Sequence, residues 1–247
     1  MLAGCCYGVS SESVYKGNNK NILEHSDIDG SQVQIIKWMS VEGRIIDCYV
    51  LGRGEERVLI IASMHGNENA GSFLVRRLLS HLFENQHLLN GKQVILIPEV
   101  NPDGIDKDNR YNSNGVDLNR NFPAFNRMNN RSAGPFPLSE PESRMIAQMI
   151  EIYYPDRIMS IHQPLKCIDY DGPSQEIAEY MSHFCDLPLR KLGAMPGSLG
   201  SYAGEGLNIP VITLELTGKT NNINKVSLWK QYKKMLTAFI LFGEYAK

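Results

Sequence analysis

The sequence contains no apolar run that approaches the roughly 18 residues needed to cross a bilayer. It also has no basic excess, because 25 Lys and Arg stand against 27 Asp and Glu and leave a net charge of −2. Proteins that bind nucleic acids normally carry such an excess. Charged residues make up 21% and aromatic residues 9% of the 247 residues, which is an ordinary globular composition. We therefore expect a globular protein with no transmembrane segment and no nucleic-acid partner.

Cysteine is scarce, and several catalytic signatures are absent. Of the five cysteines, Cys48, Cys167 and Cys185 lie far apart, and no pair has the CxxC spacing. We therefore expect buried thiols rather than disulfides or redox chemistry. The sequence has no P-loop, Gly52-x-Gly54 lacks a third glycine, and no serine stands in a Gly-x-Ser-x-Gly elbow. These absences argue against nucleotide binding and serine-hydrolase chemistry.

The N-terminus carries two features of a tethered protein. Leu2-Ala3-Gly4-Cys5 resembles the lipobox of bacterial lipoproteins, in which the cysteine is lipidated. Only Met1 precedes it, so the basic and apolar regions of a signal peptide are not within this sequence. The following residues are rich in Ser, Asn, Lys and Gly, as in a linker. We predict a flexible tether over residues 1–30 and two alternatives for location: the cell envelope with a lipid anchor at Cys5, or the bacterial cytoplasm.

Hydrophobic patterning over residues 31–247 predicts one domain of the α/β class. Apolar or alternating runs predict strands, and helical spacing predicts helices, over the following ranges: strands 34–39, 44–51, 58–63, 93–98, 157–162 and 211–216; helices 69–83, 140–153, 174–185 and 227–244. Ser139-Glu-Pro-Glu142 predicts a capping box at the start of the second helix. Strands that alternate with helices indicate three α/β/α layers around a mixed, mainly parallel sheet. Ligands bind such sheets beyond the carboxyl ends of the strands.

Titratable side chains follow three of the predicted strands at that edge. One strand leads into His65-Gly-Asn-Glu68, another ends in His162, and a third ends in Glu215. Two imidazoles, one carboxylate and an open position form the ligand pattern of catalytic zinc, and Glu215 would then be the general base. On spacing alone the alternative stays open, because His-x-x-Glu pairs arise by chance and a strand-end histidine is often a hydrogen-bonded core residue.

A long polar segment between these strands offers cations for a substrate. It contains Asn101-Pro-Asp-Gly104 and Asp117-Leu-Asn-Arg-Asn-Phe-Pro123. Arg110 and Arg120 are flanked by Asn and Gly rather than by acids, so their guanidinium groups are available for a ligand carboxylate. Loops of this length in a compact domain are usually functional.

Taken together and in this order, these motifs resemble the zinc carboxypeptidase family from about Val58 to Gly218. The short length and the His-Gly-Asn-Glu form are most similar to the murein peptide amidases within it. The resemblance implies zinc-dependent hydrolysis of the γ-D-glutamyl–meso-diaminopimelate bond in cell-wall peptides, with small peptides from peptidoglycan as substrates.

The resemblance also implies roles for individual residues. His65, Glu68 and His162 match the ligands of one Zn²⁺ per chain, Glu215 the general base, and Arg110 the arginine that stabilises the oxyanion. Asn119 and Arg120 match the pair that binds the terminal carboxylate of the substrate. Ser198 lies where the family builds its specificity pocket, and Asp169 or Asp171 would bind an amino group of diaminopimelate or only form a turn before Gly172. The tyrosine that caps the substrate in digestive carboxypeptidases stays unassigned between Tyr170 and Tyr202.

Two other functions remain as alternatives. Succinylglutamate desuccinylases and aspartoacylases are related zinc amidases that act on N-acyl amino acids, and the Asp-Leu-Asn-Arg-Asn-Phe-Pro string fits them as well. No C-terminal β-domain follows in this sequence, which favours the peptidase. A non-catalytic module that binds peptidoglycan peptides would not need a base, so Glu215 beside a complete ligand set favours an enzyme.

Overall fold

The computed structural model describes residues 22–28, 31–218, 220 and 223–243. Cys5 and the rest of residues 1–21 lie outside the described residues, so the predicted lipid anchor stays a prediction. Residues Ile22–Ile28 form strand β1, which pairs antiparallel with the next strand. The predicted tether over residues 1–30 is therefore wrong for this part, which is the edge of the sheet. The sequence did not predict this strand because its composition, Ile-Leu-Glu-His-Ser-Asp-Ile, is largely polar.

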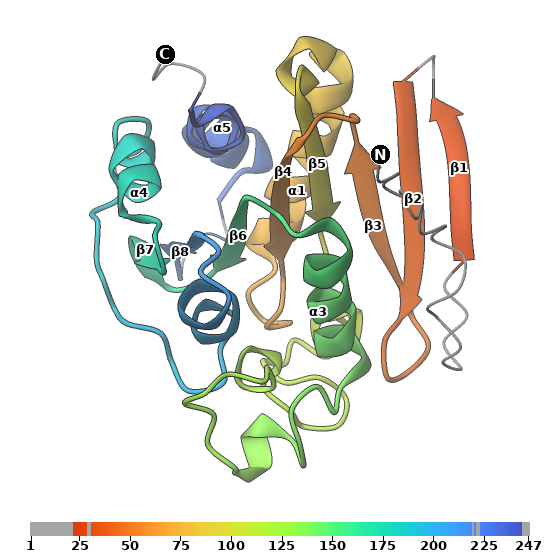
Figure 1. Ribbon diagram of the computed structural model, residues 1–247, viewed down its shortest axis with the longest axis vertical. Coiled ribbons are helices and arrows are strands. Elements are labelled where there is room, and N and C mark those ends of the chain that lie inside the picture. Colours follow the sequence, from red (N-terminus) through yellow and green to blue (C-terminus); the bar gives the residue numbers. More distant parts are fainter. Residues whose placement is uncertain (1–21, 29–30, 219, 221–222, 244–247) are drawn as a thin grey trace, which may run out of the picture.

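A single mixed sheet of eight strands forms the centre of the molecule (Figure 1). Its spatial order is β1-β2-β3-β5-β4-β6-β8-β7. The bounds of the strands after β1 are β2 Ser31–Met39, β3 Ile45–Leu51, β4 Glu56–Ala62, β5 Lys92–Ile97, β6 Arg157–His162, β7 Leu165–Asp171 and β8 Val211–Thr217. The neighbours β5, β4, β6 and β8 run parallel, whereas β1 to β3 and β7 flank them in antiparallel pairing. The predicted mixed sheet with a parallel core is thus confirmed.

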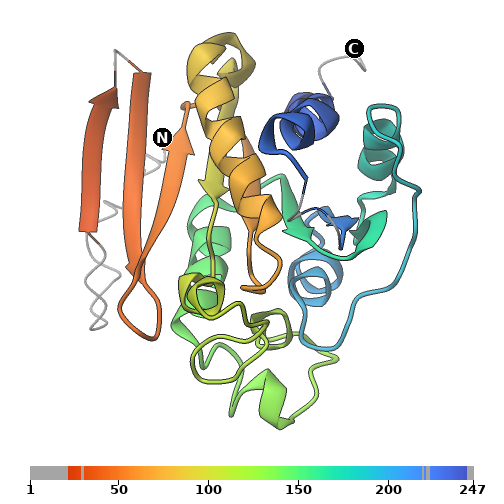
Figure 2. The same cartoon turned by 180° about the vertical axis from the view of Figure 1, so that it is seen from behind.

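Helices cover both faces of the sheet and complete the three predicted layers. Helices α1 (Ala70–Glu84), α4 (Gln175–Ser182) and α5 (Lys225–Leu241) lie on one face, and α3 (Pro141–Tyr153) lies on the other (Figures 1 and 2). Along β4, Val58 and Ile60 pack into the core beneath the first group, whereas Leu59 and Ile61 pack toward α3. Side chains alternate between the faces of a strand, so a strand covered on both faces must be apolar throughout.

The start of α3 differs from the predicted capping box. The residue before the helix is Glu140, and no side chain caps the first turn. Glu142 is fully buried, and its carboxylate accepts hydrogen bonds from the Val41 amide and the Asn112 side chain, both at 3.1 Å. The predicted capping box is wrong, because tertiary donors take the carboxylate that would have reached back to the helix end.

The cysteines behave as predicted within the described residues. Cys48 and Cys167 are buried free thiols, and Cys185 is a half-buried one. Burial raises the pKa of the Cys167 thiol to about 11, which makes it a poor nucleophile. No helix among the described residues is both long enough and apolar enough to span a bilayer.

The connections that build the site lie at the carboxyl edge of the parallel strands, at the bottom of Figure 1. The segment predicted as one long loop contains the short helix α2 (Pro102–Asp106) and two single 3₁₀ turns, Leu118–Arg120 and Arg131–Ala133. A π-helical turn, Gly200–Gly206, precedes β8. In the register of β6 and β8, His162 lies directly beside Glu215.

Candidate active site

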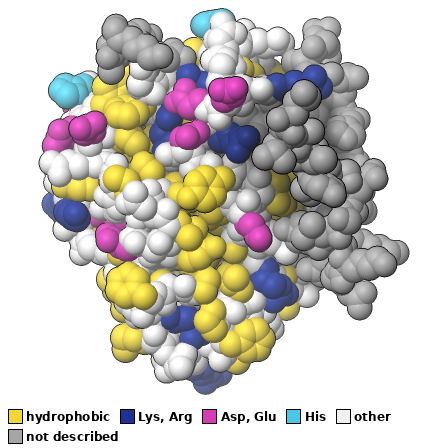
Figure 3. All heavy atoms as spheres, viewed as in Figure 1, with side chains coloured by type: hydrophobic (Ala, Val, Ile, Leu, Met, Phe, Trp, Pro, Cys, Tyr) yellow, Lys and Arg dark blue, Asp and Glu magenta, His cyan; other side chains and the backbone are white. Residues whose placement is uncertain are grey.

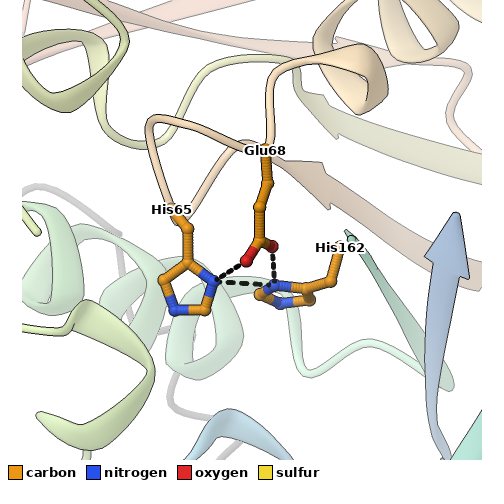
Figure 4. Close-up of side chains that lie close together, drawn as sticks. All are labelled: His65, Glu68 and His162. Carbon is orange, nitrogen blue, oxygen red and sulfur yellow. Dashed lines mark hydrogen bonds and ion pairs between the residues drawn. The ribbon is translucent and has the colours of Figure 1, made fainter. Parts of the chain in front are cut away.

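Three side chains converge on one point at the carboxyl edge of the sheet (Figure 4). His65 and Glu68 lie on the turn after β4, and His162 is the last residue of β6. The Glu68 carboxylate lies 3.0 Å from Nδ1 of His65 and 2.9 Å from Nδ1 of His162, and the two Nδ1 atoms are 3.2 Å apart. All three residues are buried, and their ligand atoms lie within 4.8 Å of one another.

This set of donor atoms fits a catalytic zinc ion. Two imidazole nitrogens and one carboxylate leave a fourth position for water or substrate. Burial opposes ionisation of Glu68, but hydrogen bonds from His162 and His65 outweigh it and hold the pKa of Glu68 well below its ordinary value. An ionised carboxylate between two imidazoles is the form that binds a cation.

Close backbone contact explains the glycines beside these ligands. A Cβ on Gly66 would lie 2.0 Å from the carbonyl carbon of Gly104, so any side chain at this position would force the turn after β4 away from helix α2. The Asn101 side chain accepts a hydrogen bond from the Gly104 amide at 2.9 Å and donates to the Met64 carbonyl at 3.3 Å. Asn101 therefore holds the start of the long segment against the turn that carries His65 and Glu68.

Further partners orient the three candidate ligands from outside. Asp117 lies 2.9 Å from Nε2 of His65, and the Ser160 hydroxyl lies 2.8 Å from Nε2 of His162. The Gln163 amide donates to the Glu68 carboxylate at 3.1 Å. Such contacts select the tautomer of each imidazole and leave the other nitrogen for the metal. Sequence reasoning missed the role of Asp117, although an acid at the head of the Asp-Leu-Asn-Arg string was the available signal.

Glu215 lies beside this cluster as the sequence predicts. It is 8% exposed, and its carboxylate accepts a hydrogen bond from the Leu165 amide at 3.2 Å. Burial raises the pKa of Glu215. Among the described residues it forms no ion pair, unlike Glu68. A buried carboxylate with a raised pKa is suited to accept and return a proton.

Arg110 faces the same cluster from the loop between helix α2 and the 3₁₀ turn Leu118–Arg120. Its guanidinium forms ion pairs with Asp117 at 2.9 Å and with Glu68 at 3.2 Å, and its side chain is 36% exposed. A guanidinium that is half open to the pocket can turn toward a substrate oxygen while Asp117 keeps hold of its other edge. This placement agrees with the predicted role in stabilising an oxyanion.

Asn119 and Arg120 lie next to each other on a 3₁₀ turn. Arg120 donates to the Asn119 carbonyl at 2.6 Å, and the Asn119 side chain accepts from the Leu199 amide at 2.9 Å. Within the described part of the chain, Arg120 has no ion-pair partner, and burial lowers the pKa of its guanidinium. A half-buried cation without a carboxylate is a ready site for one.

Asp171 lies on the side of the site formed by the end of β7. Asp171 is 4% exposed, and its Oδ1 has no hydrogen-bond partner in the part of the chain that the structure describes. Burial, reinforced by the charges of Asp169 and Glu205, raises the pKa of Asp171 to about 7. A Cβ on Gly200 would lie 1.9 Å from Asp171 Oδ2, so this glycine is what makes room for the carboxylate. Ser198 lies one turn away, and its hydroxyl accepts from the Ser201 amide at 3.1 Å.

One cavity of about 460 Å³ brings all of these groups together. It is lined by every residue predicted for the site: His65, Glu68, Arg110, Asn119, Arg120, His162, Asp171, Ser198 and Glu215. The two candidate capping tyrosines are not among its lining residues. Tyr202 stacks on Phe122 at 5.7 Å between ring centroids, and Tyr170 faces the Lys191 ammonium at 5.4 Å. The structure therefore assigns no capping tyrosine to either position.

Comparison with known proteins agrees with this geometry. The family model described as zinc carboxypeptidase matches residues 29–181. Murein peptide amidase A of Escherichia coli (strain K12) is 37% identical over 178 residues, which cover 65% of this chain and 71% of that protein. The corresponding protein of Vibrio campbellii is 29% identical over 182 residues, with 65% and 69% covered.

Solved structures give the same result. The crystal structure of murein-tripeptide amidase from Escherichia coli O157 has a TM-score of 0.63 and 28% identity, and the match covers 82% of this chain and 88% of that one. Carboxypeptidase A from Helicoverpa armigera has a TM-score of 0.70 at 19% identity, with 86% and 69% covered. The second likeness concerns the fold alone and places the three-layer architecture among the carboxypeptidase folds.

Proposed function

Since the chain belongs to the zinc carboxypeptidase family and is a hydrolase, we propose that its substrate is a murein peptide. The bond cleaved would be the amide between γ-D-glutamate and meso-diaminopimelate. Murein peptide amidases are among its relatives by sequence and by structure, which supports this choice over the desuccinylases and aspartoacylases.

One observation carries the proposal for the substrate. The cavity that holds the candidate ligands also contains Arg120 and Asp171, and the described residues offer neither an ion-pair partner to Arg120 nor a hydrogen bond to Oδ1 of Asp171. Diaminopimelate as a leaving group carries carboxylates and, on its side chain, an ammonium group. Arg120 with Asn119 would bind the carboxylate next to the scissile bond, and Asp171 would bind the ammonium group. A leaving group with only one of these charges would leave the other residue unpaired.

The residues divide the chemistry between them. His65, Glu68 and His162 would hold one zinc ion, which when bound polarises the scissile carbonyl and makes water more acidic. Glu215 takes the proton of the attacking water and returns it to the leaving amide nitrogen. Arg110 donates hydrogen bonds to the oxygen on which negative charge develops. Asp117 holds both His65 and Arg110, so it couples the orientation of the ligand to that of the oxyanion donor.

The experiment compares substrates that differ in the charges of the leaving group. Zinc-loaded protein is incubated with L-Ala-γ-D-Glu-meso-diaminopimelate, with the same tripeptide ending in L-norleucine, whose side chain lacks the ammonium group, with an ordinary C-terminal peptide and with N-succinylglutamate. Mass spectrometry identifies the products. We expect release of diaminopimelate to be fastest, and Glu215→Gln protein, purified in the same way, to release it at least about 10²-fold more slowly. Preferred cleavage of the ordinary peptide or of N-succinylglutamate would show that the proposed substrate is wrong.

We also propose that Cys5 is lipidated, on the basis of the lipobox-like sequence Leu2-Ala3-Gly4-Cys5. If Cys5 is lipidated, the protein from its native cells should partition with membranes, and its N-terminal peptide should have the mass of a diacylglyceryl cysteine. An unmodified N-terminal peptide would favour the cytoplasm.

A further inference from the structure

Two segments that line the mouth of the cavity, and a third that is hydrogen-bonded to one of them, contain no acidic residue. Residues 123–139, 164–166 and 187–197, which we call the rim, contain no Asp or Glu and are all described by the structure. Leu165, Leu192 and Met195 of the rim line the cavity itself. Asn126 joins two of the segments, since its side chain donates to the Ala194 carbonyl at 3.3 Å and accepts from the Gly197 amide at 3.1 Å.

The rim exposes large apolar side chains in an unusual concentration. Phe125 is 80% exposed, Met128 59%, Met195 51% and Leu192 48%. Single exposed apolar side chains need no explanation, but a group of them around one cavity indicates a contact surface. The proposed substrate is a small and highly charged peptide, so it does not account for Phe125 and Met128, which do not line the cavity.

The charges on the rim are all of one sign. Arg131, Lys166, Arg190 and Lys191 are exposed, whereas the chain as a whole has a net charge of −2. In the lower part of Figure 3, over the loops at the bottom of Figure 1, apolar and basic side chains lie together and no acidic side chain is visible. The exposed basic residues therefore lie in the same region as the exposed apolar side chains of the rim.

We propose that the rim docks on an anionic lipid bilayer, with the mouth of the cavity at the level of the headgroups. Anionic lipids attract Lys and Arg, and apolar side chains such as Phe125 and Met128 enter the boundary between headgroups and acyl chains. A wall polymer of sugars and charged peptides would satisfy the cations but would leave the apolar side chains exposed to water. The bilayer is the partner that matches both kinds of side chain.

The test uses the whole chain without a lipid anchor, residues 1–247, in a vesicle sedimentation assay. Vesicles of phosphatidylcholine mixed with phosphatidylglycerol are compared with vesicles of phosphatidylcholine alone. We expect the protein to sediment with the anionic vesicles at low salt and to be released at high salt, because salt screens the attraction. Protein that stays in the supernatant with anionic vesicles would overturn the proposal.

Two double variants test the two halves of the rim. Arg131→Glu with Arg190→Glu should weaken the partition coefficient by at least about 30-fold, since each cation near an anionic surface contributes about a factor of five. Phe125→Ser with Met128→Ser should weaken it by about tenfold. None of these four residues lines the cavity, so hydrolysis of a soluble peptide and the thermal melt should stay as in the unchanged protein.

Matched controls lie at the opposite end of the molecule. Ile152 and Tyr154, at the carboxyl end of α3, are 50% and 62% exposed, and Lys230 and Lys234 are exposed on α5. Serine at the first pair and glutamate at the second should leave vesicle binding within about twofold, because charges beyond a Debye length of the bilayer act weakly. Equal losses from rim and control variants would contradict docking through the rim. Sedimentation with isolated wall sacculi but not with anionic vesicles would show that the partner is the wall polymer.

Discussion

The two ends of the active-site cavity treat charge in opposite ways. At the end that holds His65, Glu68 and His162, every charged or titratable group has a partner within the protein, with Asp117 and Ser160 completing the outer contacts. At the end that holds Arg120 and Asp171, one cation has no ion pair among the described residues and one carboxylate oxygen has no hydrogen bond. The first arrangement prepares a binding site for an ion, and the second leaves charges to be matched by a substrate. Substitutions should therefore change chemistry at one end and binding at the other.

The largest expected effect is at Glu215, which stands between the two ends. Glu215→Gln keeps the shape and hydrogen-bond capacity but cannot accept a proton. We expect kcat to fall about 10²–10⁴-fold or more while KM and the zinc content per chain stay unchanged. Steady-state kinetics together with metal analysis measure this. A variant that kept its turnover would remove the general base from the mechanism.

Arg110 should behave as part of the chemical end. Its guanidinium has ionic partners now, and its proposed substrate contact strengthens only as the oxyanion forms. Arg110→Ala should therefore lower kcat about 10²–10³-fold with little change in KM. The matched variant Arg110→Lys keeps the charge without the planar fork and should recover only part of the loss.

Arg120 should show the reverse pattern. A substrate carboxylate is charged in the ground state and in the transition state alike, so its partner contributes to both. A charge-assisted contact of this kind contributes roughly 1.5–3 kcal/mol, so Arg120→Ala should raise KM about 10- to 150-fold with a small effect on kcat. If Arg110→Ala and Arg120→Ala had the same effect on KM alone, the distinction between the two ends would fail.

Asp117 offers a test of the metal end by affinity rather than by rate. Asp117→Asn keeps one oxygen for the His65 contact but removes the charge that Arg110 and His65 face. Loss of such an outer partner typically weakens zinc binding about 10- to 100-fold. Competition with a chelator of known affinity measures the change, and Asp171→Asn protein, altered at the other end, is the control that should bind zinc normally.

The smallest expected effect is a change in the stability of the Asp171→Asn protein. It shows whether Asp171 serves substrate binding or folding. Burial raises the pKa of this carboxyl to about 7 in the folded protein from its ordinary value of 3.8, so the folded state holds the proton more tightly and loses stability as pH rises between these values. Asp171→Asn should thus stabilise the protein by on the order of 2 kcal/mol at about pH 8 and not at about pH 4, while KM for the diaminopimelate peptide rises about tenfold. Thermal melts at the two pH values check the first effect. A loss of stability at the higher pH would mean that Asp171 is a structural residue.

Much of the candidate site could be predicted because its chemistry follows strands with strong hydrophobic patterns. β4 is apolar from Val58 to Ala62, and β6 is buried along its whole length, so their carboxyl ends and the residues His65 and His162 were visible in the sequence. β7 was missed because Leu-Lys-Cys-Ile-Asp-Tyr-Asp mixes exposed and buried residues on an edge strand. Asp169 and Asp171 lie two residues apart on that strand, and both line the cavity. They are therefore part of the cavity wall and do not form a turn.

The partners of the ligands could not be predicted, because they depend on contacts between distant parts of the chain. Asp117 follows His65 by 52 residues, and its carboxylate reaches the His65 ring only because the polar segment folds back against the turn after β4. Asn112 is another case. Its side chain donates to Glu140 at 2.7 Å and to Glu142 at 3.1 Å, and so anchors the loop between Arg110 and Asp117 to the start of α3. Spacing in the sequence gives no sign of either contact.

The position of β8 has a consequence for the order in which the enzyme is assembled. β8 follows β7 in the chain but lies between β6 and β7 in the sheet, and it is the only described strand that pairs with β7 along its length. A chain that leaves the ribosome residue by residue presents both histidines and Glu68 long before Glu215 arrives. Only when β8 inserts into the sheet can Glu215 lie beside His162. Only then can β7, which carries Asp171, pair with β8 and close the cavity. The ion-binding end is thus available early in synthesis, whereas the ability to cut a peptide comes last, with the final strand.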